Sequence, residues 1–160
     1  VQNVSDNTPA TWRSSSDIGG NPGSTDETNF QRWSMENDVN DPFSDSDHDG
    51  MSTLTEYAIG GDPNMVSSNT GITIRLEILD RDDAIDEYLI IDVTRRIGAD
   101  DVVFKIQMAQ SLNEWSDLIF PKSVIKSINN GNGTETVSYI VGKLNEIGDG
   151  MYFRKVVLLK

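Results

Sequence analysis

The sequence of 160 residues contains no cysteine, a single histidine and no long apolar run. The absence of cysteine excludes disulfides, thiolate metal sites and cysteine nucleophiles, but it assigns no compartment because many secreted domains also lack cysteine. No apolar stretch approaches the ~20 residues that a membrane helix requires. Residues 1–16 show no signal-peptide pattern, so an exported protein would begin here after processing. We therefore expect no membrane insertion.

Basic residues are scarce, with 13 Lys and Arg against 26 Asp and Glu. A net charge of −13 repels phosphate backbones and anionic lipid, so we expect no nucleic-acid partner. The imbalance is concentrated in residues 1–64, which hold 12 acidic and 2 basic side chains, whereas residues 65–160 hold 14 and 11. Such a local excess indicates either a solvated, disordered tail or a cation site.

Residues 1–24 are rich in Ser, Asn, Gly and Pro and are expected to be irregular or strand-like, without a core of their own. A capping box at Ser24 to Glu27, followed by Phe30 and Trp33, predicts a short helix over about residues 25–37. Pro42 prevents that helix from continuing into the acidic segment. A second short helix is expected to carry Leu54, Tyr57 and Ala58 and to stop at Gly60-Gly61. We treat residues 25–66, which contain both helices and the acidic segment between them, as one region of the chain.

The pattern changes to a period of two after Gly71. Ile72, Ile74, Leu76 and Ile78 alternate with polar residues, which predicts a half-buried strand. Turn signals at 98–101, 130–133 and 148–150 separate further strands. These are expected at about 87–95, 102–109, 123–128, 135–142 and 150–159. The sequence thus predicts a mainly β chain, with an antiparallel, Ig-like β-sandwich over residues 71–160.

Residues 45–56 have the spacing of a twelve-position calcium loop. Asp45, Asp47 and Asp49 occupy positions 1, 3 and 5, Gly50 occupies position 6 and Glu56 occupies position 12. Calcium takes about 6–8 oxygen ligands, and alternate carboxylates let a short coiled segment direct several oxygens inward. The sequence therefore predicts a Ca²⁺ site here.

The remaining ligands follow from the same pattern. Met51 would supply its carbonyl, Thr53 would bind directly or through water, and Glu56 would close the shell with both oxygens. Without metal the carboxylates repel one another, so the loop should open and its helix should dock less firmly. In the alternative interpretation, Thr53 to Glu56 is only a capping box and the aspartates form a solvated turn. Magnesium suits the loop less well because its small octahedral shell accepts fewer protein oxygens.

The segment DSDHDG, followed by LTEYAIGGDPN, resembles the calcium repeats of thrombospondin type 3 and their bacterial relatives, and more distantly the dockerin and EF-hand calcium loops. Thr53 stands where many relatives carry asparagine. Residues 12–23 resemble the end of a lamin-tail-like domain. Tyr88 to Arg96, Gln110 to Trp115 and Tyr152 to Arg154 resemble the C-terminal β-sandwich of large secreted bacterial proteins. The resemblance implies export and an accessory position at the end of a longer polypeptide.

Other acidic residues are candidates for a second site. Five of them lie between two predicted strands, but they lack the glycine and the twelve-residue pattern, so we interpret them as a charged connection: Asp80, Asp82, Asp83, Asp86 and Glu87. Asp62 would either add a ligand to the first loop or act only in stopping the helix.

An enzymatic role is not expected. His48 occupies position 4 of the loop, where side chains point away from the ion, and a cation beside it would lower its proton affinity. Two carboxylates can hydrolyse a glycosidic bond, but nothing in the sequence indicates a cleft. Trp33 and Trp115 could stack on a sugar, although such aromatics more often belong to a core.

The leading hypothesis is a calcium-stabilised structural or interaction module, extracellular or at the cell surface, whose partners are other domains or subunits of an assembly or filament. The loop lies between two compositionally different regions, where an ion would fix their orientation. The alternative is a carbohydrate-binding accessory module of an exported enzyme, which would make glycans the partner; fold analogy alone supports it. In an intermolecular version of the leading hypothesis, the polar N-terminal segment pairs with a sheet edge of another copy or of another domain.

Overall fold

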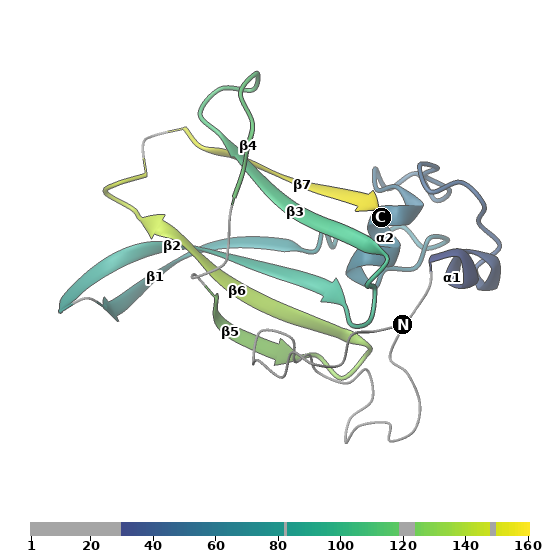
Figure 1. Ribbon diagram of the computed structural model, residues 1–160, viewed down its shortest axis with the longest axis horizontal. Coiled ribbons are helices and arrows are strands. Elements are labelled where there is room, and N and C mark those ends of the chain that lie inside the picture. The colour runs from purple at the N-terminus through teal and green to yellow at the C-terminus, as the bar shows by residue number, and fades with distance from the viewer. Residues whose placement is uncertain (1–29, 82, 119–123, 148–149) are drawn as a thin grey trace.

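The structure is a computed structural model that describes residues 30–81, 83–118, 124–147 and 150–160. Two short helices precede a series of antiparallel strands (Figure 1). The elements are α1 (Phe30–Glu36), α2 (Thr53–Ile59), β1 (Ile72–Arg81), β2 (Ala84–Arg96), β3 (Val102–Ala109), β4 (Ser116–Asp117), β5 (Val124–Asn129), β6 (Thr134–Lys143) and β7 (Tyr152–Leu159). The chain is mainly β, as the sequence predicts.

The strands form two antiparallel sheets. One has the order β1-β2-β6-β5 and the other the order β4-β3-β7. β1 and β2 form a hairpin whose register runs without a shift from the Ile72–Val93 pair to the Arg81–Ala84 pair. The register shifts once between β2 and β6, at Leu89. Every neighbouring pair in both sheets is antiparallel.

Apolar side chains from both sheets meet in one cluster. Ile91 and Val93 of β2 pack with Ile106 of β3, and all three are at most 3% exposed. Phe104 and Phe153 of the second sheet are packed against the same cluster. Burial of such side chains stabilises a fold by about 1.5–3 kcal/mol each, which makes this contact between the sheets a principal part of the core.

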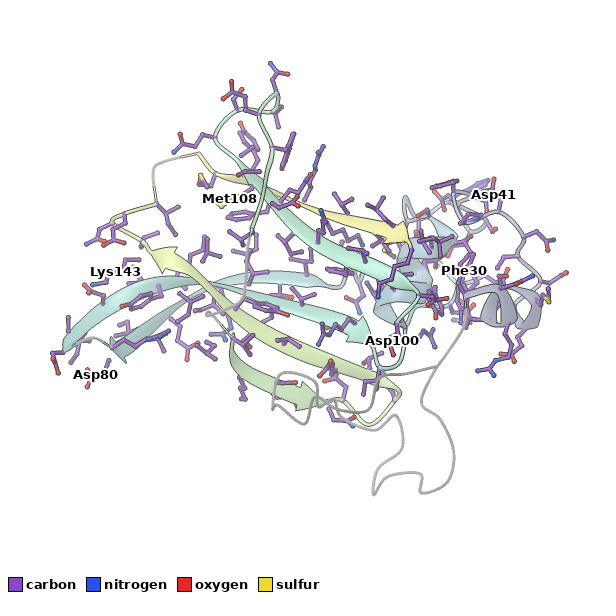
Figure 2. The ribbon with its side chains drawn as sticks, in the orientation of Figure 1. Phe30, Asp41, Asp80, Asp100, Met108 and Lys143 are labelled. Atoms are coloured by element: carbon purple, nitrogen blue, oxygen red, sulfur yellow. The ribbon has the colours of Figure 1, made fainter. Side chains whose placement is uncertain are left out.

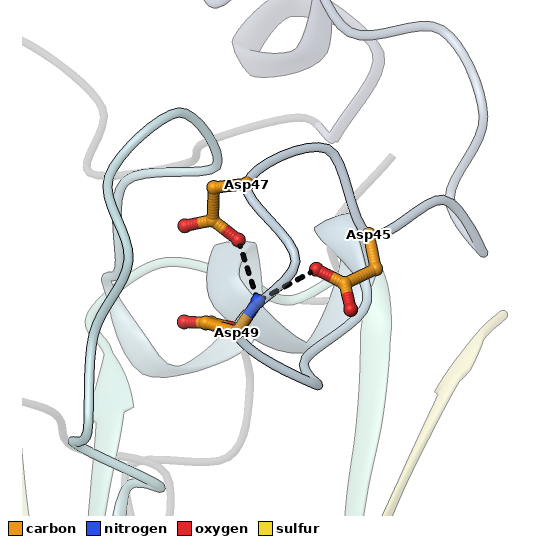
Figure 3. Close-up of side chains that lie close together, drawn as sticks. All are labelled: Asp45, Asp47 and Asp49. Carbon is orange, nitrogen blue, oxygen red and sulfur yellow. Dashed lines mark hydrogen bonds between the residues drawn. The ribbon is translucent and has the colours of Figure 1, made fainter.

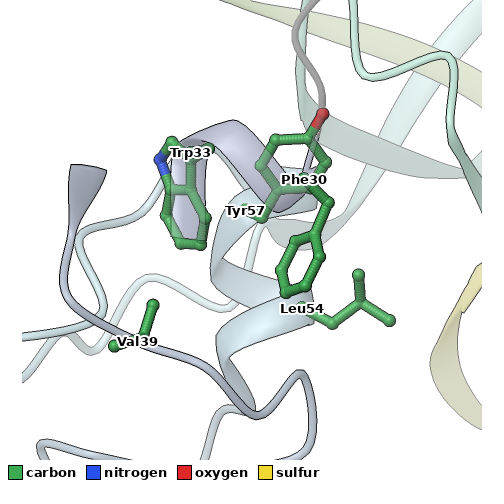
Figure 4. Packing of buried hydrophobic residues seen from close by; sticks show 5 residues of the cluster. All are labelled: Phe30, Trp33, Val39, Leu54 and Tyr57. Carbon is green, nitrogen blue, oxygen red and sulfur yellow. The ribbon is translucent and has the colours of Figure 1, made fainter. Parts of the chain in front are cut away.

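The two helices cover one end of the sheets (Figure 1). Phe30 and Trp33 of α1 pack on Tyr57 of α2, with ring centroids 5.4 Å and 5.2 Å from the Tyr57 ring (Figure 4). Val102 of β3 and Val157 of β7 are packed against this aromatic cluster. Helices of seven residues are too short to be stable alone, so they depend on this packing.

Two charged residues, Arg96 at the end of β2 and Asp101 in the turn before β3, hold the helices against the sheets. The carboxylate of Asp101, in the turn before β3, accepts hydrogen bonds from the Tyr57 hydroxyl at 2.8 Å and from the Phe30 amide at 2.6 Å. Arg96 of β2 donates from Nε to the Tyr57 carbonyl at 2.8 Å, and its guanidinium lies 5.5 Å from the centre of the Trp33 ring. Burial and the Asp101 carboxylate raise the pKa of Tyr57, so its hydroxyl stays a donor.

α2 ends where the glycine pair predicts. Gly60 is the C-cap, with a left-handed φ of 79°. A side chain at Gly60 would also collide with Thr134 of β6, so glycine is required for both backbone conformation and close packing. Gly71, with a φ of 71°, lies against Ile59 in the same way.

The predicted strands and the turns at 98–101 and 130–133 are confirmed, and β4 was not predicted. The expected half-buried face of β1 is wrong in part. Ile72 joins the core, but Ile74, Leu76 and Ile78 are 45%, 48% and 69% exposed. β1 is an edge strand of the larger sheet, and this part of it is left largely uncovered.

The lamin-tail-like segment, the Ser24 to Glu27 capping box and the turn at residues 148–149 lie outside the described residues. The predicted helix over 25–37 is therefore observed only as α1. No helix within the described ranges is long and apolar enough to cross a membrane.

We expect Asp101→Ala to destabilise the protein by about 1–3 kcal/mol, because it leaves the Tyr57 hydroxyl and the Phe30 amide without their acceptor. Urea denaturation measures this difference. Asp80→Ala, at the exposed end of β1, is the control and should change stability by less than about 0.5 kcal/mol. Equal effects of the two substitutions would contradict the role given to Asp101.

Candidate metal centre

The acidic loop is closed by hydrogen bonds between the start of α2 and the residues that precede the loop. The Thr53 amide donates to the Ser44 carbonyl at 2.8 Å, and the Leu54 amide donates to the Pro42 carbonyl at 2.9 Å. α1 ends at Glu36, so α2 is the one helix directly attached to the loop, as the Asp41-Pro42 pair predicts. Ser52 caps α2 by accepting a hydrogen bond from the Thr55 amide.

The structure brings three of the predicted ligands together. Asp45, Asp47 and Asp49 each offer a carboxylate oxygen, and these oxygens lie within 4.8 Å of one another (Figure 3). The Asp49 amide donates to Oδ1 of Asp45 at 3.1 Å and to Oδ1 of Asp47 at 3.2 Å. The Gly50 amide donates to Oδ2 of Asp45 at 3.0 Å, and Gly50 has a φ of 89° that favours glycine. This cluster could hold a metal ion.

Glu56 is the feature of the site that hydrogen bonding does not explain. It is 0% exposed on α2, and neither of its carboxylate oxygens has a hydrogen-bond partner among the described residues. Oδ2 of Asp47 is buried and unpartnered in the same way. A buried carboxylate normally pairs with a cation or with several donors, because removal from water disfavours its charge.

The electrostatics at Glu56 follow from its surroundings. Burial and then the charges of Asp47, Asp49, Asp45 and Asp62 raise the pKa of Glu56 to about 8. Four acidic neighbours therefore act on one buried carboxyl, and an ionised Glu56 needs a nearby positive charge. A divalent cation bound to the aspartates would supply that charge.

Lys155 is a member of this region that sequence reasoning missed. It extends from β7, and its ammonium donates to the Thr70 carbonyl at 2.7 Å and lies 3.5 Å from the Met51 sulfur. Burial lowers the pKa of Lys155, while the charges of Asp49 and Glu56 act to raise it. No local pattern could have identified a lysine that is about a hundred residues beyond the loop in sequence.

The remaining predicted residues are placed as follows. Thr53 is fully buried, and its hydroxyl lies 3.1 Å from the carbonyl and 3.0 Å from the hydroxyl of Ser44. Met51 donates its amide to Asp49 at 2.8 Å, so its peptide group adjoins the cluster. The capping-box part of the alternative is wrong, because Ser52 is the N-cap and neither side-chain oxygen of Glu56 accepts a hydrogen bond from a described residue.

The other candidates do not form comparable sites. In the second acidic cluster Asp86 pairs with Lys143 at 2.6 Å, and Asp82 lies outside the described residues. Among the described residues, the acidic side chains that lie close enough together to hold a metal ion are those of Asp45, Asp47 and Asp49. His48 is exposed, as predicted. Asp62 lies close enough to raise the pKa of Glu56, and one of its oxygens accepts from the Asn64 amide.

Comparison with known proteins identifies no relative: no family model, no curated protein and no solved structure matches the chain. The interpretation of the site therefore depends on its own geometry.

We expect the metal-free protein to lose stability as pH rises from about 4.5 to about 8. In this window the folded state keeps a proton on Glu56 that the unfolded state has released, so unfolding releases one proton. The free energy of unfolding should then fall by up to about 1.4 kcal/mol per pH unit. Chemical denaturation in chelator at several pH values measures the slope.

Glu56→Gln is the matched control because it keeps the shape of the side chain and cannot ionise. Its slope should be shallower than that of the wild type over the same pH range. Identical slopes for the two proteins would show that Glu56 is not the group responsible.

Proposed function

We propose that the chain is a calcium-stabilised, non-catalytic structural or interaction module in which a bound ion joins the helices to a β-sandwich. The observation that carries the proposal is Glu56, a fully buried carboxylate without a hydrogen-bond partner among the described residues, beside three clustered aspartates. A cation bound between them would neutralise this charge.

Calcium fits this donor set best. The candidate ligands are oxygens of Asp45, Asp47, Asp49 and Glu56, which suits a hard cation. Their spacing, with glycine at position 6, is that of a calcium loop. Magnesium prefers to keep several waters in an octahedral shell, and a fully buried Glu56 leaves little room for them on that side.

A structural role is supported by the connections of the loop. Oδ2 of Asp49 accepts from the Ser67 amide at 3.0 Å, in the segment that leads to β1. Lys155 of β7 contacts Met51 on the other side. An ion here would stiffen the joint between α2 and both sheets. A sensor of the EF-hand type opens a pair of helices around its loop, whereas this loop adjoins α2 alone.

We place the module outside the cell or at its surface, as part of a larger assembly. The support is the calcium-loop pattern itself, since weakly binding extracellular calcium modules use ligand loops of this kind. The excess of acidic residues over the whole chain favours a well-solvated protein surface, which suits a module exposed outside the cell. The partners would be neighbouring domains or subunits.

The carbohydrate-binding alternative has little support among the described aromatic residues. Trp33 is 6% exposed and packed in the aromatic cluster. Arg154 lies over the ring of Trp115 at 4.2 Å, so one face of that indole is covered. A glycan array would test this alternative directly, and binding by an isolated module would favour it.

Calcium should raise the melting temperature of the wild-type protein. At a hundredfold excess over the dissociation constant, binding adds about 2.7 kcal/mol, which corresponds to a shift of about 5–10 °C for a domain of this size. Asp47→Asn and Glu56→Gln should reduce the shift, because each removes a charge from the site. Calorimetric titration and thermal denaturation measure affinity and shift.

Asp80→Asn is the control, since it removes one acidic charge from an exposed position on β1. It should leave both affinity and shift unchanged. No calcium binding by the wild type, or an equal loss in all three variants, would refute the proposal.

Calcium should also slow hydrogen exchange at α2 more than in the β1–β2 hairpin. The Gly61 amide donates to the Glu56 carbonyl at 2.7 Å, so it reports on the stability of the helix end that carries Glu56. Hydrogen exchange with and without chelator measures the effect. If calcium slowed exchange equally in α2 and in the hairpin, it would stabilise the whole fold and not specifically the contact between α2 and the sheets.

A further inference from the structure

β1 presents an apolar row at the outer edge of the larger sheet. Ile74, Leu76 and Ile78 lie on one side of the strand and are 45%, 48% and 69% exposed. Within the described residues β1 pairs with β2 alone, so its other edge has no strand against it. An edge strand with free backbone groups is a template for another strand.

The edge lacks several of the features by which natural sheets discourage pairing. β1 is ten residues long, contains no proline or lysine and keeps an unbroken register with β2. β5, the opposite edge, is shorter, carries Lys126 and has a register shift against β6. Short length, lysine and irregular pairing all protect an edge, so β1 is the less protected of the two.

The sequence of the edge is complementary to itself. Residues 74–78 read Ile-Arg-Leu-Glu-Ile. If two copies of β1 meet antiparallel with a two-fold axis at Leu76, Arg75 of each copy lies opposite Glu77 of the other. Leu76 then lies opposite Leu76, and Ile74 lies opposite Ile78. All three apolar positions and both charges then find favourable partners.

Neighbouring registers lack this complementarity. Moving the axis to Arg75 or to Glu77 places two like charges directly opposite each other, which is destabilising. A shift of the pairing by one residue turns the apolar row toward the polar face of the partner. The charges therefore favour the register centred on Leu76 over the registers centred on Arg75 and Glu77.

The charge pair is available for such contacts. Arg75 directs Nε and Nη2 toward Asp92 of β2, and its Nη1 pairs with Glu77 of its own strand. Both side chains are more than a third exposed. In a dimer Nη1 would also meet Glu77 of the second copy, while the bonds to Asp92 remain.

We propose that a second copy of this chain pairs with β1, so that two four-stranded sheets join into one continuous sheet about a two-fold axis at Leu76. This interface is separate from the proposed calcium site: the Asp80 end of β1 lies far from the acidic loop region marked by Asp41 (Figure 2). A two-fold contact of this kind closes on itself and gives a dimer. Interfaces of one strand pair are small, so the dimer is weak and forms as concentration rises.

Single cysteine variants test the register, since the natural chain has no cysteine to interfere. Facing residues in an antiparallel pair have Cα atoms about 4.5–5.5 Å apart, within the range of a disulfide. Leu76→Cys should therefore form a covalent dimer under mild oxidation. Two copies of residue 74 would lie about 13 Å apart along the strands, so Ile74→Cys alone should cross-link on the order of tenfold more slowly.

A mixture of Ile74→Cys and Ile78→Cys should restore rapid cross-linking, because these positions face each other. Cross-linking at equal rates in all variants, or in none, overturns the proposal. Ile128→Cys on β5, 44% exposed, serves as the control for random collision and should cross-link slowly.

Sedimentation velocity provides a test without oxidation. The wild type should show a concentration-dependent dimer, and Leu76→Lys should abolish it by placing two like charges at the axis. Ile128→Lys, a matched change on the other edge, should dimerise like the wild type, and circular dichroism confirms that the variants are folded. A wild type that stays monomeric at every concentration overturns the proposal, as does an unchanged dimer in folded Leu76→Lys.

Discussion

The structure depends above all on the charge of one side chain, Glu56. α2 places this carboxylate inside the protein, where no described donor reaches it and three aspartates lie nearby. Removal of a charge from water is costly, and the neighbouring acids add to that cost. The helix can dock firmly only if the charge is neutralised, by a proton or by a cation. The chemical state of this one group is therefore coupled to the packing of the aromatic cluster, because Tyr57 is the next residue on the same helix.

That coupling extends into the sheets through a few polar contacts. Arg96 and Asp101 hold Tyr57 from the β2–β3 side, and Lys155 reaches the loop from β7. Each contact joins residues that are far apart in sequence, and each lies at the same end of the molecule. The arrangement concentrates the tertiary connections of the helices into a small region next to the acidic cluster. A change in the loop would therefore have only short distances to cross before it reached both sheets.

Sequence patterns predicted most of the secondary structure and the members of the acidic cluster, for clear physical reasons. Alternating side chains identified the long strands, glycine and proline marked α2, and the spacing of carboxylates identified Asp45, Asp47 and Asp49. Burial could not be predicted in the same way. The alternation in β1 correctly indicated a strand, but the exposure of Ile74 to Ile78 depends on how far the second sheet extends, which no local pattern encodes. For the same reason Lys155 was missed, and the contact of the Thr53 hydroxyl with Ser44 was not predicted.

The shortness of the two helices has a consequence for the loop they flank. Seven residues cannot hold a helix in water, so α2 has its present geometry only while the sheets are folded beneath it. A peptide that contained the acidic loop alone would lack the fixed position of Glu56 and would have to order it at the expense of binding free energy. The strength with which this loop would hold an ion is thus a property of the whole fold, and a distant defect in the core would weaken binding without changing any of the acidic side chains.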